Sequence, residues 1–126
     1  MKYIKRKLPG DSTRAIQSSL HSFTSVNIAT NTTANTYQAG TEQDISLLES
    51  YCFFVKNLGG VNSATLKVQL SPNGIDWVDD SLDTPLAASA STIITASRFL
   101  KYIRILYKST IPDNHTAINV IFQGQS

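Results

Sequence analysis

Residues 64–70 decide the fold, and they read Ala64-Thr65-Leu66-Lys67-Val68-Gln69-Leu70. The apolar side chains occupy every even position, and the polar ones occupy every odd position. This period of two is typical of a β-strand with one face on a core and the other in water. A shift of one residue in register would bury the polar set, so the pattern also predicts which face points inward.

Two further segments repeat the alternation. Residues 99–108 and 116–123 carry apolar side chains at every second position over much of their length. Together the three segments predict a core of Leu66, Val68, Leu70, Ile103, Ile105, Ile118, Val120 and Phe122. Residues 51–57 are nearly all apolar, which predicts a central strand covered on both faces. Cys52 lies in this run and is expected to be a small buried hydrophobe, with an intermolecular disulfide as the alternative.

Turn-forming residues separate these runs, at 57–60, 72–74 and 112–114. Residues 22–36 and 87–97 are rich in Ser, Thr and Ala, and we interpret both as strands or extended segments because β-branched Thr favours strands. Disorder is the alternative for residues 31–35. No segment shows a sustained helical period. The spacing predicts an all-β fold, a two-sheet antiparallel β-sandwich of jelly-roll or Greek-key kind with seven to nine strands.

Charge divides the chain into two parts. Residues 1–14 carry a net charge of +4, and the remaining residues carry −2. Pro9 and Gly10 interrupt the basic segment before the first strand signals. We therefore expect an extended N-terminal arm over residues 1–14 and one sandwich domain over residues 15–126. The arm has no apolar run of the kind that a Sec signal peptide needs, and no stretch approaches the roughly 20 apolar residues of a membrane span.

The composition favours a protein that packs against other proteins. Only 16% of the 126 residues are charged, against roughly 25% in an average domain, and Ser, Thr, Asn and Ala take their place. His21 and His115 are far apart and belong to no metal-ligand motif, and no Gly-x-Ser-x-Gly nucleophile motif is present. We expect no enzyme activity, no cofactor and no metal. The basic arm is too short a signal to predict nucleic-acid binding.

The segment after the 72–74 turn is acidic. Asp76, Asp79, Asp80 and Asp83 fall within eight residues. Clustered carboxylates can bind Ca²⁺, but this spacing matches no calcium loop, so a solvated acidic hairpin that contacts a basic partner is the preferred interpretation. Trp77 follows a turn similar to an Asp-box hairpin, in which the Trp packs under the turn. Stacking of Trp77 on a sugar ring is the alternative.

Three pieces in this order resemble a known group: Phe53-Phe54-Val55-Lys56-Asn57-Leu58-Gly59, then Leu70-Ser71-Pro72-Asn73-Gly74-Ile75-Asp76-Trp77, then Phe99-Leu100-Lys101-Tyr102-Ile103-Arg104-Ile105. Over about residues 40–123 the chain resembles uncharacterised short β domains of Gram-positive spore-forming bacteria. The same layout is similar to the endospore-appendage (Ena-type) pilins, jelly-roll subunits that polymerise through an N-terminal connector and sheet-to-sheet contacts. The resemblance implies a self-assembling surface-fibre subunit. Those pilins carry connector cysteines for intersubunit disulfides, and residues 1–51 here have none, which excludes that route of cross-linking.

We therefore predict a structural subunit that polymerises with itself, head to tail, into an extracellular or spore-surface filament. Other surface or spore-coat proteins are further candidate partners. The alternatives are a phage tail or capsid accessory domain located in a virion, and a carbohydrate-binding module. The predicted subunit interface joins an arm segment to the acidic hairpin, and it consists of Tyr3, Ile4, Lys5, Arg6, Lys7, Leu8, Asp76, Asp79, Asp80 and Asp83.

Overall fold

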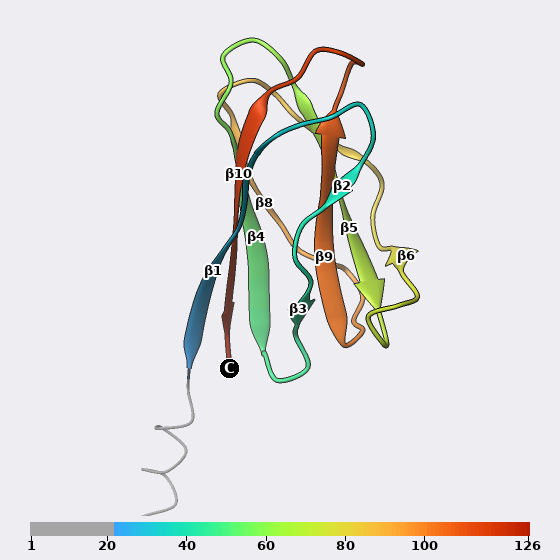
Figure 1. The fold of residues 1–126 in the computed structure, drawn as a ribbon. Helices are drawn as coiled ribbons and strands as arrows, with labels where there is room; N and C mark the ends of the chain where they lie inside the picture. The colour runs from blue at the N-terminus through green and yellow to red at the C-terminus, as the bar shows by residue number, and fades with distance from the viewer. Residues whose placement is uncertain (1–21) are drawn as a thin grey trace, which may run out of the picture.

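The computed structural model describes residues 22–126, and these residues form two antiparallel sheets packed face to face (Figure 1). The predicted arm over residues 1–14 lies outside the described residues. The first sheet, sheet A, has the strand order β1 (Phe23–Thr32), β10 (Ala117–Gln125), β4 (Ser50–Asn57) and β8 (Ser91–Ile94).

The second sheet, sheet B, is built around two long central strands, β9 (Tyr102–Ser109) and β5 (Ala64–Ser71). Two short strands, β2 (Gln38–Ala39) and β3 (Gln43–Asp44), pair with β9 on one side. Two others, β6 (Val78–Asp79) and β7 (Thr84–Leu86), pair with β5 on the other side. The sequence predicts seven to nine strands, and the described chain has ten. The count is higher because it includes three strands of only two residues each.

The strand order is that of a jelly roll. We number the strands along the chain and count β2 with β3 as one strand and β6 with β7 as one strand, which gives eight. In this numbering the order across sheet A is 1, 8, 3, 6, and the order across sheet B is 2, 7, 4, 5. Such interlocked Greek keys join two sheets of a sandwich. The sequence-based prediction of an antiparallel jelly-roll or Greek-key sandwich is confirmed.

The core lies between the sheets and contains every residue that the alternation predicts. Each of those eight side chains is at most 1% exposed. They are joined by further buried residues, including Ile45, Phe53, Val55 and Tyr107. Phe53 and Phe122 meet edge to face, with their ring centroids 5.3 Å apart. Burial on this scale is the main favourable contribution to folding.

Strand β4 corrects one expectation. It is central in sheet A, between β10 and β8, but only one of its faces is covered. Phe53 and Val55 are fully buried, whereas Cys52 and Phe54 point to the opposite face and are half-buried. A run of consecutive apolar residues predicts two buried faces, and here the outer half of the run faces outward instead. Cys52 is therefore not a core residue.

Two more segments were correctly interpreted as extended. Residues 22–36 contain β1, and residues 87–97 contain β8. In the described part of the chain, no helix has the length and hydropathy that crossing a membrane requires.

Candidate subunit interface

The predicted interface has two halves, and the structure describes one of them. The arm residues Tyr3 to Leu8 lie outside the described residues. The four aspartates lie on the segment that leaves β5, forms β6 and leads to β7, at one side of sheet B.

Local hydrogen bonds shape the start of this segment. The Ser71 hydroxyl accepts bonds from the amides of Asn73 and Gly74, at 3.2 and 2.8 Å. The Asn73 side-chain oxygen accepts from the amides of Ile75 and Asp76, both at 2.9 Å. Gly74 has φ = 77°, a conformation that glycine adopts without strain. Asn73, which stands where the related hairpin motif has Asp, thus fixes the turn through its side-chain oxygen, and its side-chain amide donates to the Asp76 carboxylate at 2.8 Å.

Asp79 and Asp83 are exposed but bound to neighbours on sheet B. Asp79 accepts from Gln69 at 2.8 Å and pairs with Lys67 at 3.3 Å. These contacts, led by the hydrogen bond from Gln69, lower the pKa of Asp79. Asp83 accepts the hydroxyl of Tyr37 at 2.5 Å. Burial of the ring and this hydrogen bond raise the pKa of Tyr37, so the Tyr37 hydroxyl stays protonated and donates.

Asp80 differs from the other three. Its side chain is 1% exposed, and it accepts bonds from the amide of Ser97 at 2.7 Å and from Nε of Arg98 at 3.1 Å. Burial acts to raise the pKa of Asp80, but these donors outweigh it and the pKa is lowered. Its carboxylate therefore joins two loops of its own chain. Asp76, Asp79 and Asp83 remain as the solvent-facing acids of the predicted interface.

The acidic segment does not gather its carboxylates around one point. Each of the four has its own partner, and residues 22–126 contain no group of three or more His, Cys, Asp or Glu side chains placed to bind a metal ion. Trp77 is half-buried, and the guanidinium of Arg104 stacks on its ring at 4.1 Å. Gln69 holds that guanidinium with bonds of 2.9 and 2.7 Å.

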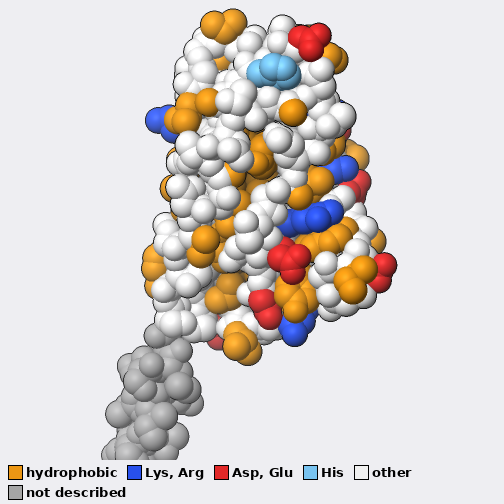
Figure 2. Space-filling model, viewed as in Figure 1, with side chains coloured by type: hydrophobic (Ala, Val, Ile, Leu, Met, Phe, Trp, Pro, Cys, Tyr) orange, Lys and Arg blue, Asp and Glu red, His pale blue; other side chains and the backbone are white. Residues whose placement is uncertain are grey.

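A second surface, the outer face of sheet A, is not among the sequence-based predictions. The four strands of this sheet contain one charged residue, Lys56, in 31 positions. Apolar side chains lie across this face among neutral polar ones: Phe23, Phe54, Ile93 and Ile121. Phe23 is 64% exposed and Ile93 is 70% exposed. Figure 2 shows charged side chains gathered mainly on the side of β9 and β5, with few over β1 and β10.

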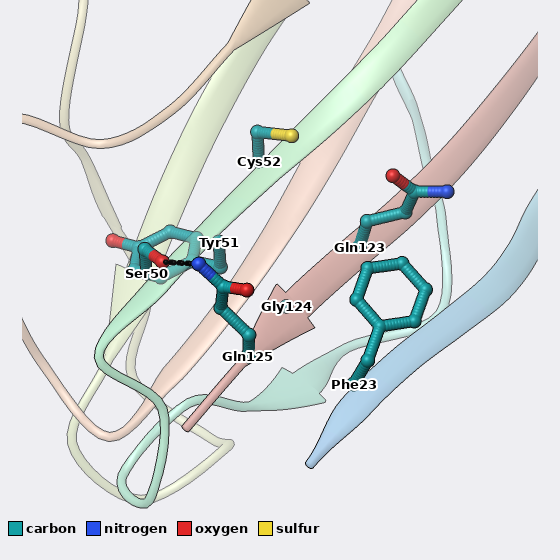
Figure 3. A pocket seen from close by; sticks show the side chains of 7 residues that line it. All are labelled: Phe23, Ser50, Tyr51, Cys52, Gln123, Gly124 and Gln125. Atoms are coloured by element: carbon teal, nitrogen blue, oxygen red, sulfur yellow. Dashed lines mark hydrogen bonds between the residues drawn. The ribbon is translucent and has the colours of Figure 1, made fainter. Parts of the chain in front are cut away.

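A shallow hollow of about 260 Å³ lies at one end of this face, between the start of β1 and the end of β10 (Figure 3). Phe23 and Cys52 line it, and the side-chain amide of Gln125 donates to the Ser50 hydroxyl at 3.1 Å (Figure 3). Its remaining lining residues are Tyr51, Gln123 and Gly124. The described chain enters the sandwich at this hollow, because Ser22 and Ser126 are hydrogen-bonded beside it.

One Ser–His pair occurs at the other end of the sandwich. The Ser109 hydroxyl lies 2.8 Å from Nδ1 of His115 and 2.7 Å from the hydroxyl of Thr33. Ser109 is 2% exposed, so its oxygen is enclosed by protein groups. The neighbouring Asn57, fully buried, binds the hydroxyl of Thr116 at 2.7 Å and the carbonyl of Asn62 at 2.9 Å. This network ties the loops at that end together.

Comparisons with known proteins give one matching family model and one solved structure, XepA, of similar fold. A family model described as "Domain of unknown function (DUF6385)" matches residues 44–126. No curated protein sequence matches the chain. The crystal structure of PBSX exported protein XepA superposes with a TM-score of 0.59 at 16% identity, over 82% of this chain and 37% of XepA. The crystal structure of PirA superposes with a TM-score of 0.47 at 12% identity, over 81% of this chain and 93% of PirA. The chain thus spans well under half the length of XepA.

Proposed function

This chain belongs to the DUF6385 family of β-domains, and from that premise we propose that it is a non-catalytic structural subunit that assembles with copies of itself outside the cell. The observation that carries the proposal is the nearly charge-free outer face of sheet A. Solvated monomers cover such faces with charged residues, whereas surfaces buried between proteins are depleted of charge and enriched in aromatic residues.

The location outside the cell is supported by the likeness to XepA, which is described as an exported protein. The filament form is supported by the resemblance of residues 40–123 to spore-appendage pilins and by the jelly-roll strand order. A spore surface is the setting that this resemblance favours.

Assembly proceeds through the basic arm. Residues 1–14 carry a net charge of +4, and the exposed carboxylates of Asp76, Asp79 and Asp83 lie on the side of sheet B. A contact between the arm of one copy and the acidic segment of the next joins two different surfaces. Such a head-to-tail contact extends without limit unless the rotation between copies closes a ring.

The test is deletion of residues 1–10, with assembly measured by negative-stain electron microscopy and by sedimentation. We expect the full chain to form long polymers and the truncated chain to remain folded and monomeric or dimeric, because the cationic segment is gone. Far-ultraviolet circular dichroism checks the fold. A truncated chain that polymerises as well as the full chain contradicts the arm mechanism.

The same images separate this function from its rivals. Closed rings of the full chain would favour a phage tail or capsid accessory domain. Monomers that bind a glycan array would favour a carbohydrate-binding module. Trp77, the residue expected to serve that module, has Arg104 stacked on its ring, which leaves less of the indole for a sugar.

A further inference from the structure

Strand β1 forms a long, unprotected sheet edge. It has ten residues and pairs only with β10 within the described chain, while the other edge strands, β2, β3, β6, β7 and β8, have two to four residues. Edge strands usually carry charged residues or proline, which prevent pairing with another chain. The sequence of β1, Phe23-Thr24-Ser25-Val26-Asn27-Ile28-Ala29-Thr30-Asn31-Thr32, contains neither.

A bulge divides this edge into two parts. The register with β10 shifts between Asn27 and Ala29. The residue between them, Ile28, lies against Gly40, where an added Cβ would be 2.5 Å from Cγ2 of Ile28. Ile28 therefore closes the gap toward sheet B, and Phe23–Asn27 remains as a regular five-residue edge on the side of the hollow.

The hydrogen-bond pattern shows which groups on this edge point outward. The carbonyl of Ser22 accepts from the amide of Ser126 at 3.0 Å, so Ser22 bonds toward β10. The carbonyl of Gln125, the partner of Phe23, accepts instead from Glu49 on the other side of β10, at 2.9 Å. The direction of hydrogen bonding alternates along an antiparallel strand. The backbone amides and carbonyls of Phe23, Ser25 and Asn27 therefore point away from β10, in the plane of the sheet and beyond its edge.

We propose that this edge pairs with the same edge of a second copy, antiparallel about a two-fold axis at Ser25, and joins the two copies of sheet A into one eight-stranded sheet. Ser25 then faces Ser25 of the second copy, and Phe23 faces Asn27. Each residue whose backbone amide and carbonyl point outward then lies opposite another such residue. The amides and carbonyls of the two strands therefore hydrogen-bond to each other. A two-fold contact of this kind uses one patch twice and closes after two copies.

Charge favours a second copy over the basic arm as the occupant. In a two-fold contact, a charged side chain near the axis would lie close to the same side chain of the second copy, and the two would repel. Strand β1 has no charged residue, so this repulsion does not arise. The arm is cationic, and the strands of sheet A contain no acidic residue to attract it. This contact is therefore additional to the arm contact and independent of it.

The experiment is a cysteine cross-link in the full-length chain with Cys52→Ser as background. In Ser25→Cys the two cysteines would lie on directly opposed residues, with Cα atoms roughly 5.5 Å apart, which suits a disulfide. We expect mild oxidation to convert most of the protein to a covalent dimer on non-reducing SDS gels. Thr30→Cys is the matched control on the same strand and face. The two cysteines at position 30 would be roughly 30 Å apart, at 3.4 Å per residue, so this variant should stay monomeric.

A second pair of variants tests the register. Phe23→Cys and Asn27→Cys should each fail to cross-link alone, because like residues are roughly 14 Å apart. A mixture of the two should give the heterodimer. A Ser25→Cys chain that stays monomeric, together with a mixture that gives no heterodimer, overturns the proposal, and so does equal cross-linking of Thr30→Cys. Because SDS dissociates non-covalent polymers, a covalent dimer from a chain that forms no filaments supports this contact while contradicting the arm mechanism.

Discussion

At the scale of the residue, Asp80 is the carboxylate on which the acidic segment depends. It is nearly fully buried and holds the backbone at Ser97 and the side chain of Arg98. Asn57 has the same role at the other end of the sandwich, where its amide and oxygen serve several loops at once. Each of these side chains fixes loops that contain few apolar residues of their own, so removal of either leaves donors or acceptors unpaired.

Asp80→Asn should therefore destabilise the protein by roughly 2 kcal/mol at pH 7, because charge-assisted hydrogen bonds are lost. The pKa of Asp80 in the folded state is below its ordinary value near ~3.9. Its contribution is then fully present above about pH 4 and is lost as the pH falls through the folded-state pKa. Thermal melts should show a gap between wild type and variant at pH 7 that narrows toward pH 2.

The matched control for this prediction is Asp76→Asn, an exposed carboxylate on the same segment whose contact is Asn73. We expect its free energy of unfolding, obtained from thermal melts, to stay within about 0.5 kcal/mol of the wild-type value, as for most surface substitutions. Equal losses for Asp76→Asn and Asp80→Asn would mean that burial of Asp80 does not matter.

At the scale of the element, alternation was the most informative sequence signal. It identified the inner faces of β5, β9 and β10, because burial on one face requires a period of two. It failed for β4, since Cys52 and Phe54 are as apolar as their buried neighbours although they face outward. Composition cannot tell a strand with two covered faces from one whose second face is left partly open.

The candidate interface is only partly predictable for the same reason. The acidic residues are close together in the sequence, which predicts one shared surface. Their different partners, Lys67, Tyr37 and Arg98, are 12 to 46 residues away and are brought near by the pairing of strands. The neutral face of sheet A contains no motif. Its signal is that 31 strand positions contain a single charged residue, Lys56, which becomes visible only when strand order is known.

The segment from β5 to β7 should be stable without metal. Its carboxylates are bound by Asn73, Gln69, Ser97 and Tyr37, so none needs a cation to offset its charge. We expect the same melting temperature in excess EDTA and in millimolar Ca²⁺. A fall of several degrees in EDTA that Ca²⁺ restores would reveal a site that these contacts do not predict.

At the scale of the whole molecule, charge is divided between the two sheets. The strands of sheet B carry Lys67, Arg104, Lys108, Asp44 and Asp79, whereas those of sheet A carry Lys56 alone. The division gives the molecule one surface suited to salt-sensitive contacts and one suited to salt-insensitive ones. Polymers joined by the arm should therefore weaken as ionic strength rises, while a contact through β1 should persist.

A charge exchange tests the arm contact directly. Lys5→Glu with Lys7→Glu should abolish polymers, because the net charge of residues 1–14 falls from +4 to 0 and the arm loses its attraction to the acidic segment. Adding Asp76→Lys and Asp83→Lys to that chain should restore attraction and polymers, as measured by sedimentation at low salt. Lys56→Glu, on the other sheet, is the control and should assemble normally. If the variant with all four substitutions forms no more polymer than the variant with two, the arm docks elsewhere.

The proximity of Ser22 and Ser126 has a practical consequence for engineering. Their hydrogen bonds bring both ends of the described chain to one pole of the sandwich, beside the hollow (Figure 1). The loops at 58–63 and 110–116 lie at the opposite pole, where Asn62 binds the carbonyl of His115 at 3.0 Å. Cargo joined at Ser22 or at Ser126 would crowd the pole where β1 begins and β10 ends. Peptides for multivalent display belong instead in the far loops, where the proposed assembly would repeat them once per copy.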